Sequence, residues 1–112
     1  MERTGRSREA ESYYRRALDV APGYSNAACF LGQLLAEQGR LEEALEPLRR
    51  GLEANPYHEV CSNHLLATLA NLGRVGQAQR ELERATAAGV AIDPRLAVLI
   101  RGLGADPADD AR

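Results

Sequence analysis

A Gly-Arg pair recurs three times along this 112-residue chain, with the same spacing of 34 residues each time. The pairs are Gly5-Arg6, Gly39-Arg40 and Gly73-Arg74. Other columns keep this period, namely Ala10, Ala44 and Ala78, then Tyr14, Leu48 and Leu82, and then Ala17, Gly51 and Ala85. Repeats of this length are typical of stacked units that bury their apolar faces only against their neighbours. The repeat therefore predicts a small array whose function depends on its surfaces.

Within each period, apolar residues recur at three- and four-residue steps, which predicts amphipathic helices and no strands. The middle period contains a helix over about 25–38, a turn at Gly39, and a helix over about 41–54 that ends at Pro56. The next period repeats this scheme around Gly73. The predicted fold class is therefore all-α, with antiparallel helical hairpins stacked on one another and about six helices.

Both ends of the chain depart from the period. At the start, a turn at Gly5 and one helix over about 7–20 form only half a hairpin. At the other end, Pro94 comes four residues later than the period predicts. A short helix over 94–103 follows, and its predicted inner side contains Leu96, Leu99, Ile100 and Leu103.

We expect one domain over residues 1–104, followed by a disordered acidic tail over 105–112. The parts of the domain are a partial repeat at 1–24, a full repeat at 25–58, a full repeat with an extended connection at 59–92, and a capping helix at 94–103.

Composition limits the kinds of partner. The chain has 14 basic and 16 acidic residues, and a formal net charge of -2 gives no electrostatic attraction to nucleic acid or to an anionic membrane. No apolar run approaches the ~18 residues of a membrane span. The two cysteines, Cys29 and Cys61, match neither a disulfide framework nor a paired metal-binding motif. We therefore expect a soluble, cytoplasmic protein whose cysteines are small core residues in a reducing compartment.

The middle unit resembles the tetratricopeptide repeat. The matching residues are Ala28-x2-Leu31-Gly32-x2-Leu35, then Ala44-x3-Leu48, then Pro56. The resemblance spans about Gly5 to Gly104 and implies a short right-handed α-solenoid, in which Gly32 and Ala44 let paired helices approach closely. The third unit departs from the pattern, because Leu66 replaces the close-packing glycine.

In this family the first helix of each hairpin lines a concave groove, so the resemblance implies a set of partner-binding residues. The set is Asn26, Cys29, Phe30, Gln33 and Glu37 from the middle unit, and Val60, Asn63, His64, Ala67 and Asn71 from the next. Amides and an aromatic ring suit an extended peptide or a helix, because amides satisfy backbone donors and acceptors. The alternative is that these positions are ordinary solvated side chains. The set has no lysine or arginine, so a clamp for a partner's C-terminal carboxylate is not expected.

The first helix has no preceding helix to cover its apolar residues, Tyr13, Tyr14, Ala17 and Leu18. Three explanations remain open: the chain is a piece of a longer array, its true start lies upstream, or a second copy covers this face. The third explanation predicts a homo-oligomer, with a closed two-fold dimer as the form that avoids filaments.

The sequence predicts no catalytic residue, no cofactor and no metal site. His58, Cys61 and His64 lie at i, i+3 and i+6, but the outer two are ~120° apart around a helix and do not converge on one ion. No nucleophile-base-orienter set and no glycine-rich phosphate loop is present in the sequence. The predicted function is a non-enzymatic protein-protein interaction module or scaffold. The alternatives are a structural role through homo-oligomerisation, or an auxiliary fragment of a larger tetratricopeptide protein.

Overall fold

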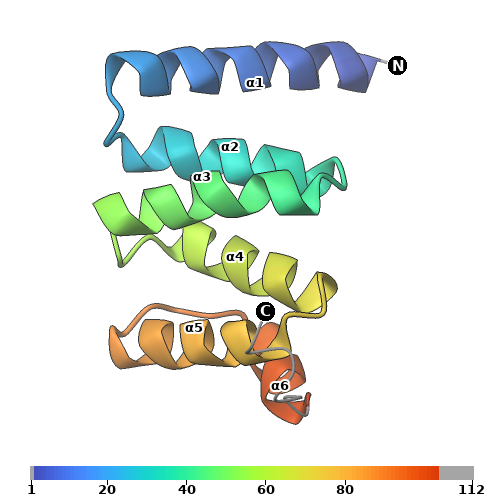
Figure 1. The fold of residues 1–112 in the computed structure, drawn as a ribbon, viewed down its shortest axis with the longest axis vertical. Coiled ribbons are helices and arrows are strands. Elements are labelled where there is room, and N and C mark those ends of the chain that lie inside the picture. Colours follow the sequence, from blue (N-terminus) through green and yellow to red (C-terminus); the bar gives the residue numbers. More distant parts are fainter. Residues whose placement is uncertain (1, 104–112) are drawn as a thin grey trace.

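The computed structural model describes residues 2–103, and within them the chain forms six α-helices and no strand (Figure 1). The helices are α1 (Glu2–Val20), α2 (Ser25–Glu37), α3 (Leu41–Ala54), α4 (Glu59–Asn71), α5 (Val75–Ala87) and α6 (Pro94–Gly102). The predicted all-α fold of stacked helical hairpins is thus confirmed. The tail predicted to be disordered, residues 105–112, lies outside the described residues.

Three glycines end helices in the same way. Gly39, Gly73 and Gly89 follow α2, α4 and α5, and have φ angles of 81°, 77° and 81°. Each glycine N–H donates to the carbonyl three residues earlier, and the next N–H donates to the carbonyl five residues earlier. This is the Schellman motif, which needs a left-handed residue that glycine adopts without a steric penalty. Gly39 and Gly73, which keep the 34-residue period, therefore specify the tight turns inside the two hairpins.

Gly5 does not form the turn that the period predicts. Helix α1 starts at Glu2 and continues through Gly5, which does not have a positive φ angle. Because Gly5 lacks the left-handed φ that ends a helix at the other glycines, α1 is not interrupted there, and the predicted helix start at Ser7 is too late.

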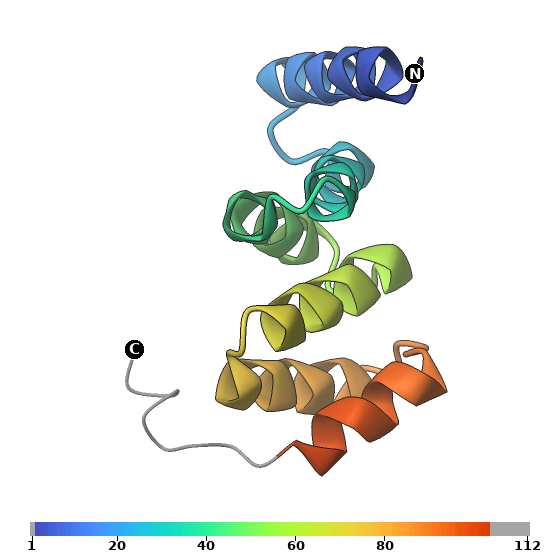
Figure 2. The same ribbon diagram turned by 90° about the vertical axis from the view of Figure 1, so that its right-hand side faces the viewer.

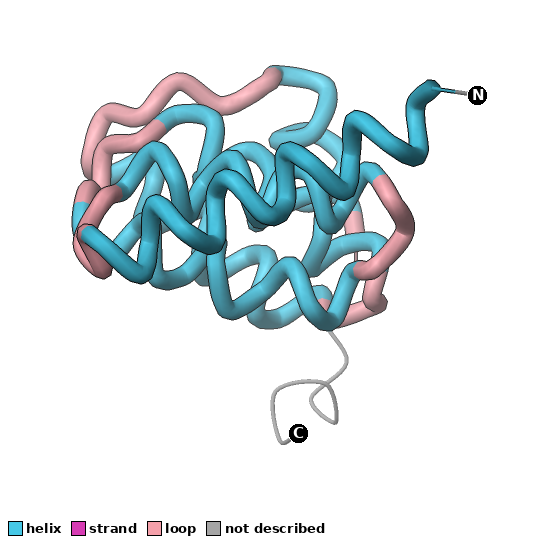
Figure 3. The backbone as a smooth tube through the Cα atoms, turned by 90° about the horizontal axis from the view of Figure 1, so that it is seen from above, coloured by secondary structure: helices cyan, strands magenta, loops and turns pink. Residues whose placement is uncertain are grey.

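The helices form two rows, and within the described part of the chain consecutive helices contact one another in one row but not in the other. Helix α2 contacts α4 and α4 contacts α6, whereas α1, α3 and α5 make no such contact with one another in residues 2–103. In Figure 2, α2, α4 and α6 lie toward one side of the stack, and α3 and α5 lie toward the other. Seen along the stack, the connecting loops gather at the two ends of the helices (Figure 3). The row of α2, α4 and α6 is therefore the inner, concave side.

The apolar core fills the space between the two rows. Leu35, Leu48, Leu66 and Ile100 are among its fully buried side chains. A Cβ added at Gly32 would lie 2.5 Å from Cγ of Leu48, so α2 and α3 approach as closely as the sequence predicts. Leu66 occupies the equivalent position in α4, where its larger side chain is fully buried.

Helix α6 packs against α4 and α5 at the end of the stack, where a capping helix is predicted. Ala97 and Ile100 are buried in it. Leu99 is 54% exposed, so its predicted place on the inner side is wrong. Successive helical residues are rotated by about 100° around the axis, and burial of Ile100 therefore turns Leu99 toward solvent.

Candidate functional site

Two parallel stripes of side chains run along the inner row of helices. On α2 the stripe consists of Asn26, Phe30, Gln33 and Glu37, and on α4 it consists of Val60, His64, Ala67 and Asn71. Within each stripe the residues are spaced at i, i+4, i+7 and i+11, which keeps them on one face of a helix. Each of these side chains is exposed or half-buried, and α2 and α4 contact each other. All ten predicted groove residues therefore lie on two contacting helices, and eight of them form the stripes.

Aromatic rings form one wall of this face. The ring centroid of Phe30 lies 6.1 Å from that of Tyr14 on α1 and 6.3 Å from that of His58 at the start of α4. Next to them is a hollow of about 290 Å³, lined by Ala10, Tyr14, Phe30, Gln33, Leu34 and Glu37. A second hollow of about 560 Å³ shares Leu34 and Glu37 with the first. Both hollows are thus lined by residues of α1 and α2.

Polar groups lie beside the aromatic wall. Gln33 Nε2 donates to Glu37 Oε2 at 3.2 Å. Burial lowers the pKa of His64, and the carboxylate of Glu37 opposes this shift. His64 is therefore neutral at pH 7 and offers one donor and one acceptor. The face thus combines an apolar hollow with amide, imidazole and carboxylate groups.

Asn63 has a structural role that the sequence analysis missed. Its Nδ2 donates to the carbonyls of Ala91 at 3.0 Å and Glu59 at 2.9 Å, and its Oδ1 accepts from the N–H of Asp93 at 2.8 Å. These bonds fasten the extended connection between α5 and α6 onto α4. The signal in the sequence was the four extra residues of that connection, whose backbone groups need partners.

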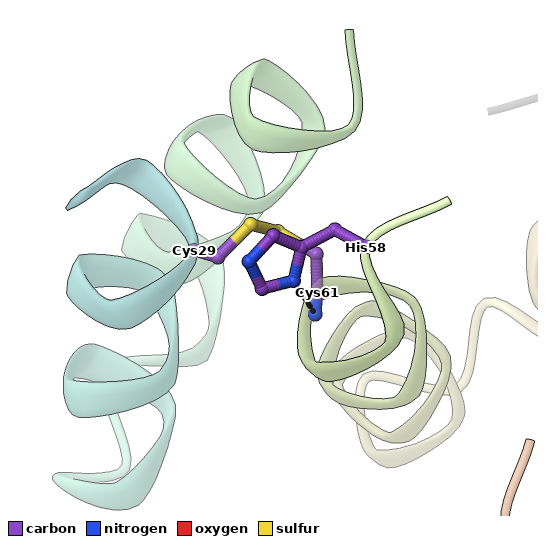
Figure 4. A group of neighbouring side chains, drawn as sticks. All are labelled: Cys29, His58 and Cys61. Carbon is purple, nitrogen blue, oxygen red and sulfur yellow. Dashed lines mark hydrogen bonds between the residues drawn. A yellow bond between two sulfur atoms is a disulfide. The ribbon is translucent and has the colours of Figure 1, made fainter. Parts of the chain in front are cut away.

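Cys29 and Cys61 form a disulfide that links α2 to α4 (Figure 4). Their Cα atoms are 5.0 Å apart, and both side chains are fully buried. The prediction that they are separate core residues is wrong, because the facing surfaces of consecutive inner helices place these two positions against each other. Gly51 on α3 leaves the space for the bridge, since a Cβ added there would collide with both sulfur atoms. As a buried bridge, Cys29 is not available to a partner in the groove.

The ring of His58 lies beside the disulfide (Figure 4). Its Nδ1 accepts from the N–H of Cys61 at 3.3 Å and so caps α4. Nε2 therefore carries the proton and donates to Asn26 Oδ1 at 2.7 Å. Ligand atoms of Cys29, His58 and Cys61 all lie within 4.8 Å of one another. The structure thus brings together a different set from the His58, Cys61 and His64 considered in the sequence.

The four residues predicted for self-association face different directions. Tyr13 is 65% exposed, whereas Leu18 is buried and Tyr14 packs against Phe30. Ala17 is half-buried. On the outer side of α1, a hollow of about 600 Å³ is lined by Tyr13, Arg16, Ala17, Val20, Ala21 and Tyr24. The exposed apolar patch is therefore made by Tyr13 and Val20 of α1 together with Tyr24, which directly precedes α2.

A sequence model of the tetratricopeptide repeat matches residues 2–59, more than half of the chain. The chain belongs to the tetratricopeptide repeat family. No curated protein sequence matches it. Tetratricopeptide repeats are generally protein-interaction modules without catalytic activity. This general role agrees with the stack of helices and with the two stripes of side chains on its inner row. Among the described helices of this tetratricopeptide repeat protein, none is both long and apolar enough to cross a membrane.

Proposed function

We propose that this chain is a non-enzymatic scaffold that binds a peptide segment or a helix of a partner protein in the groove over α2 and α4. The observation that carries the proposal is the pair of parallel stripes on contacting inner helices, next to an aromatic hollow. Stacked helical repeats generally use their extended concave surface for binding.

The chemistry of the groove favours a particular kind of segment. A hollow of about 290 Å³ beside Tyr14 and Phe30 accommodates one apolar side chain. Gln33 and Asn71 offer amides to the backbone of an extended chain. Glu37 is the charged residue of the two stripes, so a segment with a basic or neutral donor near the apolar anchor fits better than a terminal carboxylate.

Selection from a library of random displayed peptides tests this proposal. Peptides enriched on the wild-type chain are measured by fluorescence anisotropy against Phe30→Ala/Gln33→Ala. We expect at least a tenfold loss of affinity, because the pair removes the aromatic wall and an amide of the hollow. Tyr57→Ala/Gln77→Ala removes the same kinds of side chain outside the stripes and serves as the matched control. Equal affinity of both double variants, or no enriched peptide, would contradict the proposal.

A second proposed role, assembly through self-association, is favoured by the outer face of α1. Tyr13, Val20 and Tyr24 are 65%, 87% and 51% exposed around one hollow. Exposed apolar patches of this kind mark interaction sites more often than isolated exposed residues do. Light scattering of the wild type at micromolar concentration gives the oligomeric state, and Tyr13→Ser/Val20→Ser is expected to be monomeric. A monomeric wild type would remove this role.

A third proposal is that the chain is an auxiliary fragment of a larger tetratricopeptide protein. Further repeat columns in the coding sequence upstream of Met1 would support it, and unrelated sequence there would contradict it. A cytoplasmic location also stays a proposal. The Cys29–Cys61 bridge is of a type that persists in oxidising compartments. Thiol trapping in intact cells therefore tests the location: a reduced pair supports the cytoplasm, and an oxidised pair argues against it.

A further inference from the structure

We propose that the two cysteines, once reduced, bind a thiophilic metal ion together with His58. The disulfide and the metal complex are then alternative states of one buried site between α2 and α4. The three proposed ligands lie outside the two stripes of the groove, and Asn26 of the α2 stripe contacts His58.

The ligand set is suited to a soft or borderline cation. Two thiolates and one imidazole are ligands that zinc and monovalent copper accept, whereas oxygen ligands suit calcium and magnesium. The three ligand atoms already lie within 4.8 Å of one another. A sulfur and a nitrogen bound to one zinc ion can be at most ~4.4 Å apart, from Zn–S of ~2.3 Å and Zn–N of ~2.1 Å. Breaking the sulfur-sulfur bond and rotating side chains therefore brings the set to binding distance.

The second ring nitrogen of His58 has the partner that a metal-binding histidine needs. Nε2 donates to Asn26 Oδ1 at 2.7 Å, which holds the ring as the tautomer with a lone pair on Nδ1. This lone pair points at the first turn of α4, where it accepts from the N–H of Cys61 at a long 3.3 Å. Histidines that bind metals almost always donate their other N–H to an oxygen in this manner. Asn26 is therefore assigned as the residue that positions His58.

The walls of the site accommodate both oxidation states of the sulfur atoms. Cys61 Sγ lies 3.5 Å from the carbonyl oxygen of Leu48, and Cys29 Sγ lies 3.8 Å from Ser25 Oγ. Because Ser25 Oγ donates its proton to the carbonyl of Gly51, it accepts from the thiol of Cys29. Each thiol thus has an acceptor after reduction, and the pair can exist as buried dithiol without unpaired donors.

The conversion needs a reductant of the dithiol class. One thiolate of the dithiol attacks a sulfur of the bridge, which breaks the sulfur-sulfur bond, frees one cysteine and forms a mixed disulfide with the other. The second thiolate of the dithiol then attacks the reductant's own sulfur in the mixed disulfide and frees the other cysteine. The bridge gains two electrons and two protons to become two thiols, and the reductant leaves as a cyclic disulfide. The metal ion then displaces both thiol protons into solvent, because thiolates rather than thiols bind metals.

Titration of the reduced full chain with Co²⁺ alone tests the site, after the dithiol has been removed under anaerobic conditions. We expect one Co²⁺ per chain, with the thiolate-to-cobalt charge-transfer band, and displacement of that band by Zn²⁺. A competition with a coloured Cu⁺ chelator measures copper in a parallel sample. Binding of either metal by the reduced chain but not by the oxidised chain supports the proposal, and the tighter metal identifies the cation. Binding of neither metal overturns it.

Two histidines of the same chain provide a matched comparison. His58→Asn keeps a side chain that can cap α4 but removes the imidazole, so metal affinity should fall at least tenfold. His64→Asn, three residues after Cys61 and outside the cluster, should bind as the wild type does. Asn26→Ala should lose about 10- to 100-fold, the usual effect of removing a partner of a metal-binding histidine. Equal affinities of the His58 and His64 variants would overturn the assignment of His58, and circular dichroism verifies that each variant is helical.

Discussion

Reduction of the Cys29–Cys61 disulfide should lower the free energy of unfolding by several kcal/mol. The bridge joins residues 32 apart in the sequence and links α2 of one helical hairpin to α4 of the next. It restricts the unfolded chain, which loses much of its conformational freedom when the loop is closed. In the folded chain, the two thiols would stay buried in the same surroundings, so the change acts mainly on the unfolded state.

The size of the effect follows from the loop length. For a separation of 32 residues, loop closure removes about 12 cal/mol/K of entropy, which corresponds to about 3.7 kcal/mol at 25 °C. Domains of this size are usually stable by only about 5–15 kcal/mol, so reduction should remove a quarter or more of the total. With a urea dependence of about 2 kcal/mol per molar, the unfolding midpoint should fall by roughly 2 M.

Urea unfolding followed by helical circular dichroism measures this effect in oxidised and reduced samples. A metal chelator is present in both, so that no metal stabilises the reduced chain. Cys29→Ser/Cys61→Ser is the control, because its midpoint should not respond to the reductant. A difference below about 1 kcal/mol between the oxidised and reduced wild type would refute the reasoning, since it would leave most of the expected loop-closure entropy unaccounted for.

Two further predictions concern packing and pH. Gly32→Ala should destabilise the chain by about 1–3 kcal/mol, because its Cβ would press on Leu48 of α3. Gly5→Ala has open space and should be neutral or stabilising by up to about 1 kcal/mol, so thermal unfolding midpoints that move equally for both would contradict the close approach. Burial lowers the pKa of His64 in the folded chain. The contribution of this shift to the free energy of unfolding is therefore complete above the usual histidine pKa of about 6.5, and it is lost as the pH falls through that value toward the folded pKa. The free energy of unfolding should therefore fall less between about pH 7 and pH 5 for His64→Asn than for the wild type. Equal pH profiles would show that folding does not change the pKa of His64.

The repeat predicted most of the helices because the same short-range signals recur in each period. The turns at Gly39 and Gly73 and the break at Pro56 depend on local backbone preferences, which a sequence displays directly. Gly5 belongs to the same column but lies within α1 without a positive φ angle, so the turn predicted there is wrong. The column alone does not show which φ angle a glycine adopts, because glycine is compatible with both a helix and a left-handed turn.

The disulfide could not be recognised from the repeat columns. Cys29 and Cys61 are 32 residues apart, not 34, so they occupy different columns. In a stack, each inner helix turns one face toward the helix before it and a different face toward the helix after it. The two positions that meet across a contact therefore belong to different columns. Only the stacking geometry shows which two columns face each other. Asn63 illustrates the same limit, because its backbone partners belong to a connection that the period does not describe.

The most direct test of the proposed groove is to map where a bound segment lies. A peptide from the library selection, carrying a photoreactive diazirine beside its apolar anchor, is cross-linked to the wild-type chain and the attachment sites are identified by mass spectrometry. The proposal predicts attachment to the two inner stripes, within residues 26–37 of α2 and 60–71 of α4. Attachment mainly to α3, α5 or the outer face of α1 around Tyr13 would contradict it.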